Sequence, residues 1–384
     1  MLFSEILGQQ HIKNHLTVSA DSNRVAHAQL FVGPEGCGTL PMAIAYAQYL
    51  LCKNVSSENT GGNESCNLKF EHLAHPDLHF AFPVATNDKV KKHAVSNAFM
   101  NEWRQFVAKQ PYGNTFDWFQ LLGIENKQGI IGVDEATDIV KSLSLKSYEG
   151  GYKIMLIWMA DRMNTAAANK LLKLIEEPPK DTIFLLIAEK EEQIIQTIRS
   201  RCQILHFPPL TEEVIKQGLV SRGIPEAEAG KVAHSAQGNY NKAIDLSVND
   251  SEDLVFERWF IFWVRSAFKA KGNKAVINDL IMWSEEIAGT GRETQKQFLT
   301  YCMEVFRQAL LLHYQTQDLV YMDMHEEGFK LEKFAPFVHS ANIIEITKEL
   351  ETAMYHVERN GNAKIIFTDL SIKLTRYLHK KETV

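Results

Sequence analysis

The chain has 384 residues, of which 45% are hydrophobic, 47 are acidic and 41 are basic. This length predicts two or three domains of roughly 150 residues each, and the apolar fraction is sufficient for their cores. The net charge of −6 excludes a chain-wide attraction to nucleic acid, so any contact with DNA must be local or shared with a partner.

The sequence predicts a soluble, cytoplasmic protein. Glu5 lies where a signal peptide would need an apolar run, and the densest apolar stretch, residues 154–160, is too short to span a bilayer. The five cysteines are an odd number scattered along the chain, which does not indicate a disulfide framework in a protein of this size. We therefore expect a reducing compartment.

Apolar runs in the first half of the chain predict buried strands. QLFVG at 29–33 is followed by a glycine-rich loop and an alanine-rich helix. KIMLIWMA at 153–160 and TIFLLIAE at 182–189 are continuous apolar runs of the kind that is buried on both faces of a parallel sheet. A stretch with helical spacing separates them. Strands that alternate with helices predict a doubly wound α/β domain over residues 1–208.

From residue 209 onward the pattern predicts helices alone. Gly223 and Gly238 divide residues 209–249 into short helical segments, which indicates a small helical lid domain. Residues 250–384 contain aromatic-rich amphipathic segments with few helix breakers, which predict an all-α bundle. The mixed, aromatic composition of residues 85–128 predicts no particular element.

The stretch GPEGCGTL has the glycine spacing of a phosphate-binding loop without its chemistry. Such a loop needs glycines whose backbone N–H groups face the phosphates, a lysine for their charge and a hydroxyl group for Mg²⁺. The spacing is kept at Gly33, Gly36 and Gly38. Thr39, however, takes the lysine position and Leu40 takes the metal-ligand position. Losing both charged contacts should cost about two orders of magnitude or more in affinity unless another group compensates. On spacing alone, we favour a glycine turn between strand and helix over a nucleotide-binding loop.

The acidic residues of a nucleotidase are also missing from their expected place. They would stand at the end of the next buried strand, to hold Mg²⁺ and orient water. That strand ends in Trp158 and Met159, and Asp161 comes only after them. The acidic stretch VDEATD at 133–138 is not a substitute, because the preceding GIIG is too short for a central strand. We interpret it as the solvated start of a helix.

A family resemblance spans most of residues 1–248. It is carried by FSEILGQQHIKNHL, VAHAQLFVGPEGCG, HPDLHF and ADRMNTAAANKLLKLIEEPP, followed by SRC at 200–202. These segments resemble the AAA+ clamp-loader subunits of bacterial DNA polymerase III, most closely the delta-prime type. The resemblance implies an AAA+ domain of two parts, an α/β part with a helical lid, and then a helical collar through which five subunits form a ring.

The same resemblance implies partners. In this family, motor subunits of the gamma/tau type bind ATP and Mg²⁺, and with a delta subunit they load the sliding clamp onto primed DNA. The delta-prime type is the subunit that can lack a working ATP site. Ala188 and Glu189 stand where a motor would place a polar sensor, and Asn241 stands where its second sensor arginine would be. We therefore expect no cofactor bound by this chain, and no contact with a membrane.

The resemblance also assigns a role to the SRC motif, Ser200, Arg201 and Cys202. In the family, this arginine reaches across the subunit interface to the γ-phosphate bound by the neighbour. A guanidinium suits that role because it stays charged and forks onto phosphate oxygens. Such arginine fingers raise hydrolysis by roughly 10³ to 10⁵. Without the resemblance, Arg201 would be interpreted as a surface ion-pair residue. Arg199 lies nearby but does not occupy the motif position.

A zinc site is a further departure from the family. Relatives carry a four-cysteine module after the loop helix, whereas this chain has only Cys52 and Cys66 there. Two thiolates do not make a closed zinc site. Completion by His72, His75 and His79 is conceivable, but we favour a solvated loop without metal.

The sequence thus predicts a delta-prime-like, non-ATPase subunit that completes a neighbour's ATP site through Arg201. Two other hypotheses stay open. One is an active AAA+ ATPase of the motor type, with an unusual loop that takes its lysine and carboxylate from elsewhere in the fold. The other is an interaction scaffold in which Arg201 is structural. The basic run KVKKH at 89–93 could contact DNA, although a solvated loop is favoured.

Overall fold

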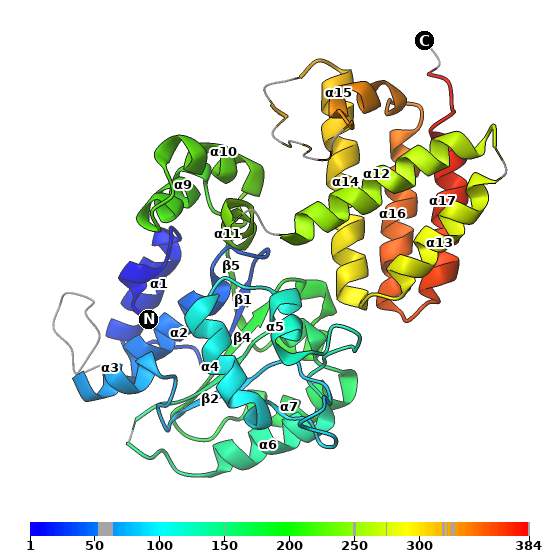
Figure 1. Ribbon diagram of the computed structural model, residues 1–384. Helices are drawn as coiled ribbons and strands as arrows, with labels where there is room; N and C mark the ends of the chain where they lie inside the picture. Colours follow the sequence, from blue (N-terminus) through cyan, green and yellow to red (C-terminus); the bar gives the residue numbers. More distant parts are fainter. Residues whose placement is uncertain are drawn as a thin grey trace. The chain divides into compact units, whose positions relative to one another are not determined.

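The computed structural model describes residues 1–52, 64–149, 151–248, 251–273, 275–316, 319–320, 322, 324, 326 and 328–382. The chain divides into two compact units (Figure 1). The first consists of Met1–Ile124 and Gln128–Ser247, and the second of Glu125–Lys127 and Val248–Val384. Within the described residues, no helix is both long and apolar enough to cross a membrane.

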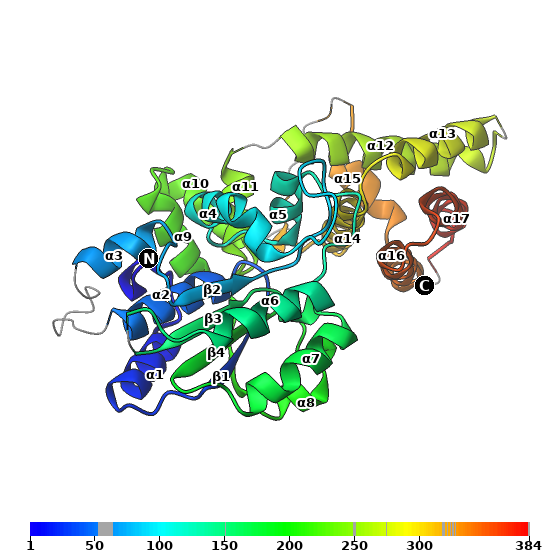
Figure 2. The same cartoon turned by 90° about the horizontal axis from the view of Figure 1, so that it is seen from below.

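A five-stranded parallel sheet forms the centre of the first unit, in the order β2-β3-β4-β1-β5; Figure 2 labels β2, β3, β4 and β1. The strands are β1 (Ala28–Val32), β2 (Leu78–Ala81), β3 (Lys153–Ile157), β4 (Thr182–Ala188) and β5 (Gln203–His206). All neighbouring strands are parallel, so their carboxyl ends lie at one edge of the sheet. The inner strands β1, β3 and β4 are buried over their whole length, which is why they appear in the sequence as unbroken apolar runs.

Helices cover both faces of this sheet. The helices of the sheet domain are α1 (Gln10–Asp21), α2 (Thr39–Leu51), α3 (Glu64–Glu71), α6 (Val133–Ser144), α7 (Thr165–Glu176) and α8 (Gln196–Arg199). Because successive side chains of a strand point to opposite faces, Phe31 joins the core under α1 and α2, whereas Leu30 joins the core under α6 and α7. The predicted doubly wound α/β class is confirmed.

Short 3₁₀ helices complete the connections. They are η1 (Phe3–Glu5), η2 (Ser96–Phe99), η3 (Ala160–Arg162), η4 (Glu191–Gln193) and, in the second unit, η6 (Ala335–Phe337).

The segment for which the sequence predicts no particular element forms helices. They are α4 (Met100–Lys109) and α5 (Thr115–Leu122). Trp103 of α4 is fully buried, with its ring centroid 4.3 Å from that of Phe82 in a stacked arrangement. Its ring also lies 5.4 Å from Trp118 of α5 and 5.2 Å from Trp158. An aromatic cluster therefore occupies the carboxyl edge of β2 and β3, where a nucleotidase would carry acidic side chains.

Helix α6 begins at Val133, as the acidic stretch VDEATD predicts, but its start is not fully solvated. Glu135 is buried, and its carboxylate accepts a hydrogen bond from the backbone N–H of Ser96 at 2.6 Å. Burial raises the pKa of Glu135 to about 7. The prediction of a solvated helix start is therefore wrong at this residue, because the chain around Ser96 returns to cover it.

The lid follows β5 and consists of α9 (Glu212–Ser221), α10 (Glu226–Ala236) and α11 (Tyr240–Val248). The side chain of Thr211 caps α9 by accepting a hydrogen bond from the backbone N–H of Val214, as predicted. Ile215, Leu219 and Ala233 are among the lid side chains of a small hydrophobic core that also includes Tyr112.

The second unit is helical throughout its described elements. They are α12 (Ser251–Ala270), α13 (Val276–Ala288), α14 (Arg292–His313), α15 (Leu331–Phe334), α16 (Ile343–Glu358) and α17 (Ala363–Tyr377). Helix α16 packs against α14 and α17 (Figure 1). In the core, the rings of Trp263 and Trp283 stack with centroids 5.0 Å apart, and the Trp263 indole N–H donates to the Ser371 hydroxyl at 2.9 Å. The predicted all-α bundle is confirmed.

We expect the Trp103→Ala substitution to lower the free energy of unfolding by about 3 to 5 kcal/mol, because it removes a fully buried indole from the aromatic cluster. Urea denaturation followed by circular dichroism measures the change. Leu121→Ala in the neighbouring helix α5 is the control: Leu121 is 42% exposed, and its loss should change the free energy by no more than about 0.5 kcal/mol. Equal losses for the two variants would contradict the packing described here.

Candidate functional site

The glycine loop joins β1 to α2 at the carboxyl edge of the sheet. Helix α2 begins at Thr39, directly after Gly38, whose φ of +96° is favourable only for glycine. Gly36 also has a positive φ, of +70°, and a Cβ atom there would lie 2.0 Å from the Asn239 side-chain oxygen. The backbone thus adopts a tight turn whose outer side is in contact with the lid.

Tyr112, from the turn between α4 and α5, fills the mouth of this loop. A Cβ atom on Gly38 would lie 3.0 Å from the Tyr112 ring, and the ring packs edge-on against Tyr240 of the lid with centroids 5.0 Å apart. The Tyr112 hydroxyl accepts a hydrogen bond from the backbone N–H of Leu7 at 2.8 Å. Burial raises the pKa of Tyr112, so the phenol stays neutral.

Glu35 connects the loop to the rest of the unit through side-chain amides. Its carboxylate accepts hydrogen bonds from the Asn114 amide at 2.9 Å and from the Asn239 amide at 3.0 Å. Asn241, at the position where a motor would place its second sensor arginine, is buried and donates to the Asp117 carboxylate at 2.8 Å. The loop, the start of α5 and the lid are therefore joined by hydrogen bonds to carboxylates, which are stronger than those between neutral groups.

The free space left in the loop is small and acidic. The cavity measures about 20 Å³, close to the volume that one water molecule needs. Its lining includes Trp158, Met159, Glu35 and Glu189. Burial, together with the charges of Glu35 and Asp161, raises the pKa of Glu189 to about 7. Among the described residues that line this cavity, there is no lysine or arginine. An anionic ligand would meet carboxylates here.

The SRC motif lies in the turn between α8 and β5. One terminal nitrogen of Arg201 donates to the Thr197 backbone carbonyl at 2.8 Å, and the other donates to the Glu176 carboxylate, also at 2.8 Å. The Ser200 hydroxyl donates to the same Thr197 carbonyl at 3.3 Å. Burial raises the pKa of the Cys202 thiol to about 11, so it stays protonated at neutral pH. Of the three residues, Arg201 alone presents a charge.

The loop and the SRC motif lie at opposite edges of the sheet. Strands β1 and β5 are parallel, with Gln29 paired with Gln203 and Val32 with His206. The glycine loop follows the end of β1, whereas Arg201 precedes the start of β5. A four-residue strand is about 13 Å long. The structure therefore does not bring Arg201 to this chain's own loop.

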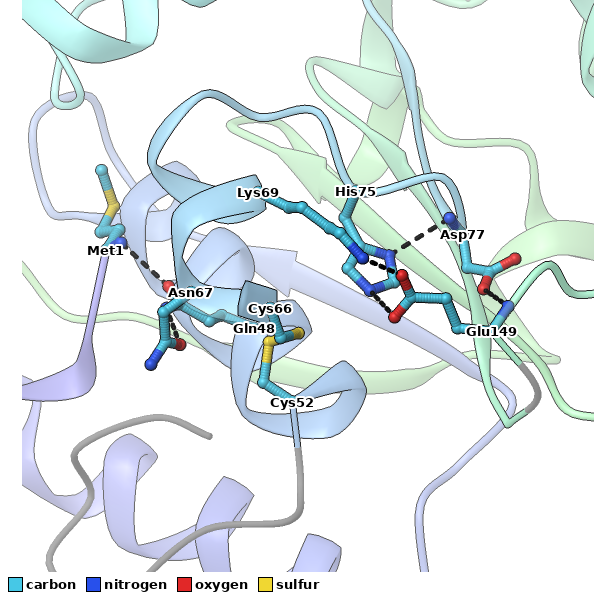
Figure 3. Close-up of a disulfide and its surroundings, with 9 residues drawn as sticks. All are labelled: Met1, Gln48, Cys52, Cys66, Asn67, Lys69, His75, Asp77 and Glu149. Atoms are coloured by element: carbon cyan, nitrogen blue, oxygen red, sulfur yellow. Dashed lines mark hydrogen bonds and ion pairs between the residues drawn. A yellow bond between two sulfur atoms is a disulfide. The ribbon is translucent and has the colours of Figure 1, made fainter. Parts of the chain in front are cut away.

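The two cysteines considered as zinc ligands form a disulfide (Figure 3). Cys52 directly follows α2 and Cys66 lies in α3; their Cα atoms are 5.7 Å apart and both side chains are buried. The expectation that the cysteines do not pair is wrong here, and the cysteines therefore no longer support the expectation of a reducing compartment. The spacing along the chain does not show that α3 returns beside the end of α2, and only this return brings the two sulfur atoms together.

The three candidate histidines do not join the cysteines. His72 is exposed, whereas His75 is buried with its Nε2 atom 3.3 Å from the Glu149 carboxylate (Figure 3). Burial lowers the pKa of both His75 and His79. In the part of the chain that the structure describes, no group of three or more His, Cys, Asp or Glu side chains is placed to hold a metal ion. The basic run at 89–93 lies in an exposed loop, where Lys89 pairs with Glu102 at 3.3 Å.

The sequence interpretation missed the residues that fill and connect the loop: Tyr112, Asn114, Asp117, Glu35 and Asn239. One local signal was available, because Asn114 followed by Asp117 has the spacing of a helix-capping pair, and the structure forms both of its hydrogen bonds. That signal predicts where α5 begins. It does not predict that the start of α5 is placed over a loop some eighty positions earlier in the chain.

A parallel sheet in this order, with a glycine loop after β1 and a helical lid after β5, defines an AAA+ type of fold. Residues 8–211 match the model of the family described as DNA polymerase III, delta subunit. The chain belongs to this family, and the resemblance noted from the sequence motifs is confirmed.

Several relatives carry names from the same complex. The DNA polymerase III subunit delta' of Bacillus subtilis is 29% identical over 242 residues, which are 63% of this chain and 60% of that protein. The delta' subunit of Haemophilus influenzae is 27% identical over 215 residues, 56% of this chain and 53% of that protein. The gamma/tau subunit of Mycobacterium tuberculosis is 28% identical over 207 residues, 54% of this chain and 28% of that protein. The similarity thus covers less than two thirds of each relative.

Solved structures give a looser likeness. A DNA polymerase III gamma subunit-related protein from Thermotoga maritima is 13% identical with a TM-score of 0.37, and the match covers 95% of this chain and 99% of that one. The RuvB Holliday junction branch migration motor of the same organism is 15% identical with a TM-score of 0.38, covering 83% of this chain and 87% of that one.

Thiol counting tests the disulfide. Protein purified without reductant and denatured should show three free thiols, those of Cys37, Cys202 and Cys302, and five after reduction. Five free thiols before reduction would contradict the bond.

The Cys66→Ser substitution should lower the free energy of unfolding by about 3 kcal/mol relative to the oxidised protein, because the bond closes a loop with a sequence separation of 14.

Proposed function

We propose that this chain is a clamp-loader subunit of the delta-prime type, which binds no nucleotide itself and completes a neighbouring subunit's ATP site through Arg201. The observation that carries the proposal is the contrast between the two sites. The chain's own side chains fill the glycine loop, whereas the SRC arginine is intact at the opposite edge of the sheet.

The loop supports the first half of this proposal. A bound triphosphate would need positive charge, yet Thr39 occupies the lysine position and the cavity lining contains the carboxylates of Glu35 and Glu189. Tyr112 and the amide contacts of Glu35 would also have to move before a nucleotide could enter. These contacts weigh against the rival hypothesis of an active ATPase, although the gamma/tau relatives are about as similar in sequence as the delta' relatives.

The position of Arg201 supports the second half. An arginine at the amino edge of the sheet is separated from its own loop by the length of a strand, so a phosphate that it contacts must belong to another chain. We propose that the neighbour is a motor subunit of the gamma/tau type and that the chain forms a five-membered ring with such subunits and a delta subunit. In the cytoplasm, this ring would load the sliding clamp onto primed DNA during replication.

The scaffold hypothesis has one observation in its favour. Arg201 already has a partner in its own chain, since it pairs with Glu176 at 2.8 Å. Both side chains are partly exposed, however, and ion pairs of this kind typically contribute no more than about 1 kcal/mol. A structural role alone gives little reason for placing a guanidinium there.

Calorimetry tests the loss of nucleotide binding. The purified chain should bind Mg-ATP no more tightly than about millimolar, because the ammonium and metal contacts are absent. The paired change Thr39→Lys and Leu40→Thr should not restore binding, since Tyr112 and Glu35 still fill the loop. Micromolar binding by the unchanged chain would overturn the proposal and favour the active ATPase.

Arg201 is tested in the reconstituted complex. Arg201→Ala should leave folding and ring assembly intact, because a partly exposed guanidinium contributes little to stability. DNA-stimulated ATP hydrolysis should fall, since the neighbour's transition state loses a charge that is worth roughly 10³ to 10⁵ at a single site. Other sites keep their own fingers, so the loss in total turnover should be partial. Arg201→Lys should rescue poorly, because an ammonium cannot reproduce the fork.

Arg199→Ala is the matched control, because Arg199 also pairs with a carboxylate of its own chain, Glu191 at 2.7 Å. It should assemble and hydrolyse ATP like the unchanged protein. Normal clamp loading by Arg201→Ala, or a larger defect in Arg199→Ala, would exclude the role in trans.

A further inference from the structure

Arg201 is held by two different acceptors of its own chain. The Thr197 carbonyl belongs to the backbone of α8, only four residues away, and it fixes one terminal nitrogen. Glu176, the last residue of α7, fixes the other. The Nε atom is buried and has no hydrogen-bond partner among the described residues. The side chain is thus already ordered, with its guanidinium at the surface.

The two contacts differ in how easily they exchange. In the Thr197 contact the acceptor is a backbone carbonyl, whose position is set by the short helix α8. The Glu176 contact joins two side chains that are 33% and 53% exposed, so water screens the pair and can replace either partner. A γ-phosphate carries more negative charge than a carboxylate and presents more acceptor oxygens. In direct competition for the same nitrogen, the phosphate should win.

We propose that Glu176 is a regulatory counter-ion for Arg201. It holds the guanidinium when the neighbouring subunit has no γ-phosphate, and it releases the guanidinium to that phosphate when ATP is bound. The proposal rests on the proposed function of Arg201 and adds to it a residue that decides how readily the arginine is available. No covalent bond is made or broken; the phosphate replaces the Glu176 carboxylate as acceptor for the same terminal nitrogen of Arg201.

The neighbouring charged residues leave Glu176 as the carboxylate partner of Arg201. Arg199, two residues before Arg201, has its own carboxylate in Glu191, so the two arginines do not share a partner. Glu177 directly follows Glu176 and is also exposed, and among the described residues it forms no ion pair. The chain therefore offers a neighbouring carboxylate of the same charge as a control.

Competition predicts a particular kinetic signature. If Glu176 opposes engagement, its neutralisation should lower the ATP concentration at which the site is half-saturated. The maximal rate should not change, because at saturating ATP the carboxylate has already been displaced. A residue with only a structural role would change neither quantity, and a residue that aims the guanidinium at the phosphate would change the maximal rate.

The experiment uses the complex reconstituted with gamma/tau-type motor subunits, a delta subunit, the sliding clamp and primed DNA. The ATP dependence of hydrolysis is measured for the unchanged chain and for Arg201→Ala, and the difference between the two curves isolates the site that Arg201 serves. For Glu176→Gln, the half-saturating ATP concentration of this difference should fall by about two- to fivefold, the range that an exposed ion pair supplies. Glu177→Gln should give the unchanged curve.

The double variant Glu176→Gln with Arg201→Ala should behave like Arg201→Ala alone. A further shift in the double variant would show that Glu176 acts by another route, which overturns the proposal. An unchanged half-saturating concentration in Glu176→Gln, or a lower maximal rate, would overturn it as well, while the role of Arg201 would stand. If Arg201→Ala itself hydrolyses ATP like the unchanged complex, the proposed function fails first. Thermal unfolding of each isolated variant confirms that the fold is kept.

Discussion

The parallel pairing of β1 with β5 is the constraint on which the rest of this structure depends. It places the glycine loop at the carboxyl edge of the sheet and the SRC motif at the amino edge. Backbone hydrogen bonds between the two strands fix the distance between these sites. A chain built in this way cannot use its own arginine on its own loop. The two sites can therefore change independently, and one can lose its chemistry while the other keeps it.

Side chains of the protein itself lie around the glycine loop. The backbone turns at Gly36 and Gly38, both with positive φ, and Tyr112 packs on one side of this turn and the Asn239 amide on the other. The negative charge at this place is now the Glu35 carboxylate, a permanent part of the chain. Because its partners come from α5 and from the lid, the same contacts that close the loop also connect the lid to the sheet domain.

Arg201, at the other edge of the sheet, has a different kind of partner. Arg201 is paired with a carboxylate that water can replace, whereas the carboxylate of Glu35 is held between two amides. Both residues are half-buried; the difference is that Glu35 accepts hydrogen bonds from two amides, whereas the Arg201 pair joins two partly exposed side chains. The chain thus has a carboxylate held by two amides in the loop and a partly exposed ion pair at the corner of α7 and α8.

Local pattern was sufficient to predict the α/β class, the parallel strands, the cap at Thr211 and the helical second half, because each depends on side chains close together in the chain. The sequence also showed the glycine spacing, the SRC motif and the replacement of the loop lysine by Thr39. It did not predict the disulfide of Cys52 with Cys66, the burial of Glu135 or the filling of the loop by Tyr112. Each of these depends on which distant segments the fold brings together, and the free energy that decides such contacts comes from burial in the assembled core. Sequence determined which side chains the chain has available; tertiary packing alone decided which of them meet.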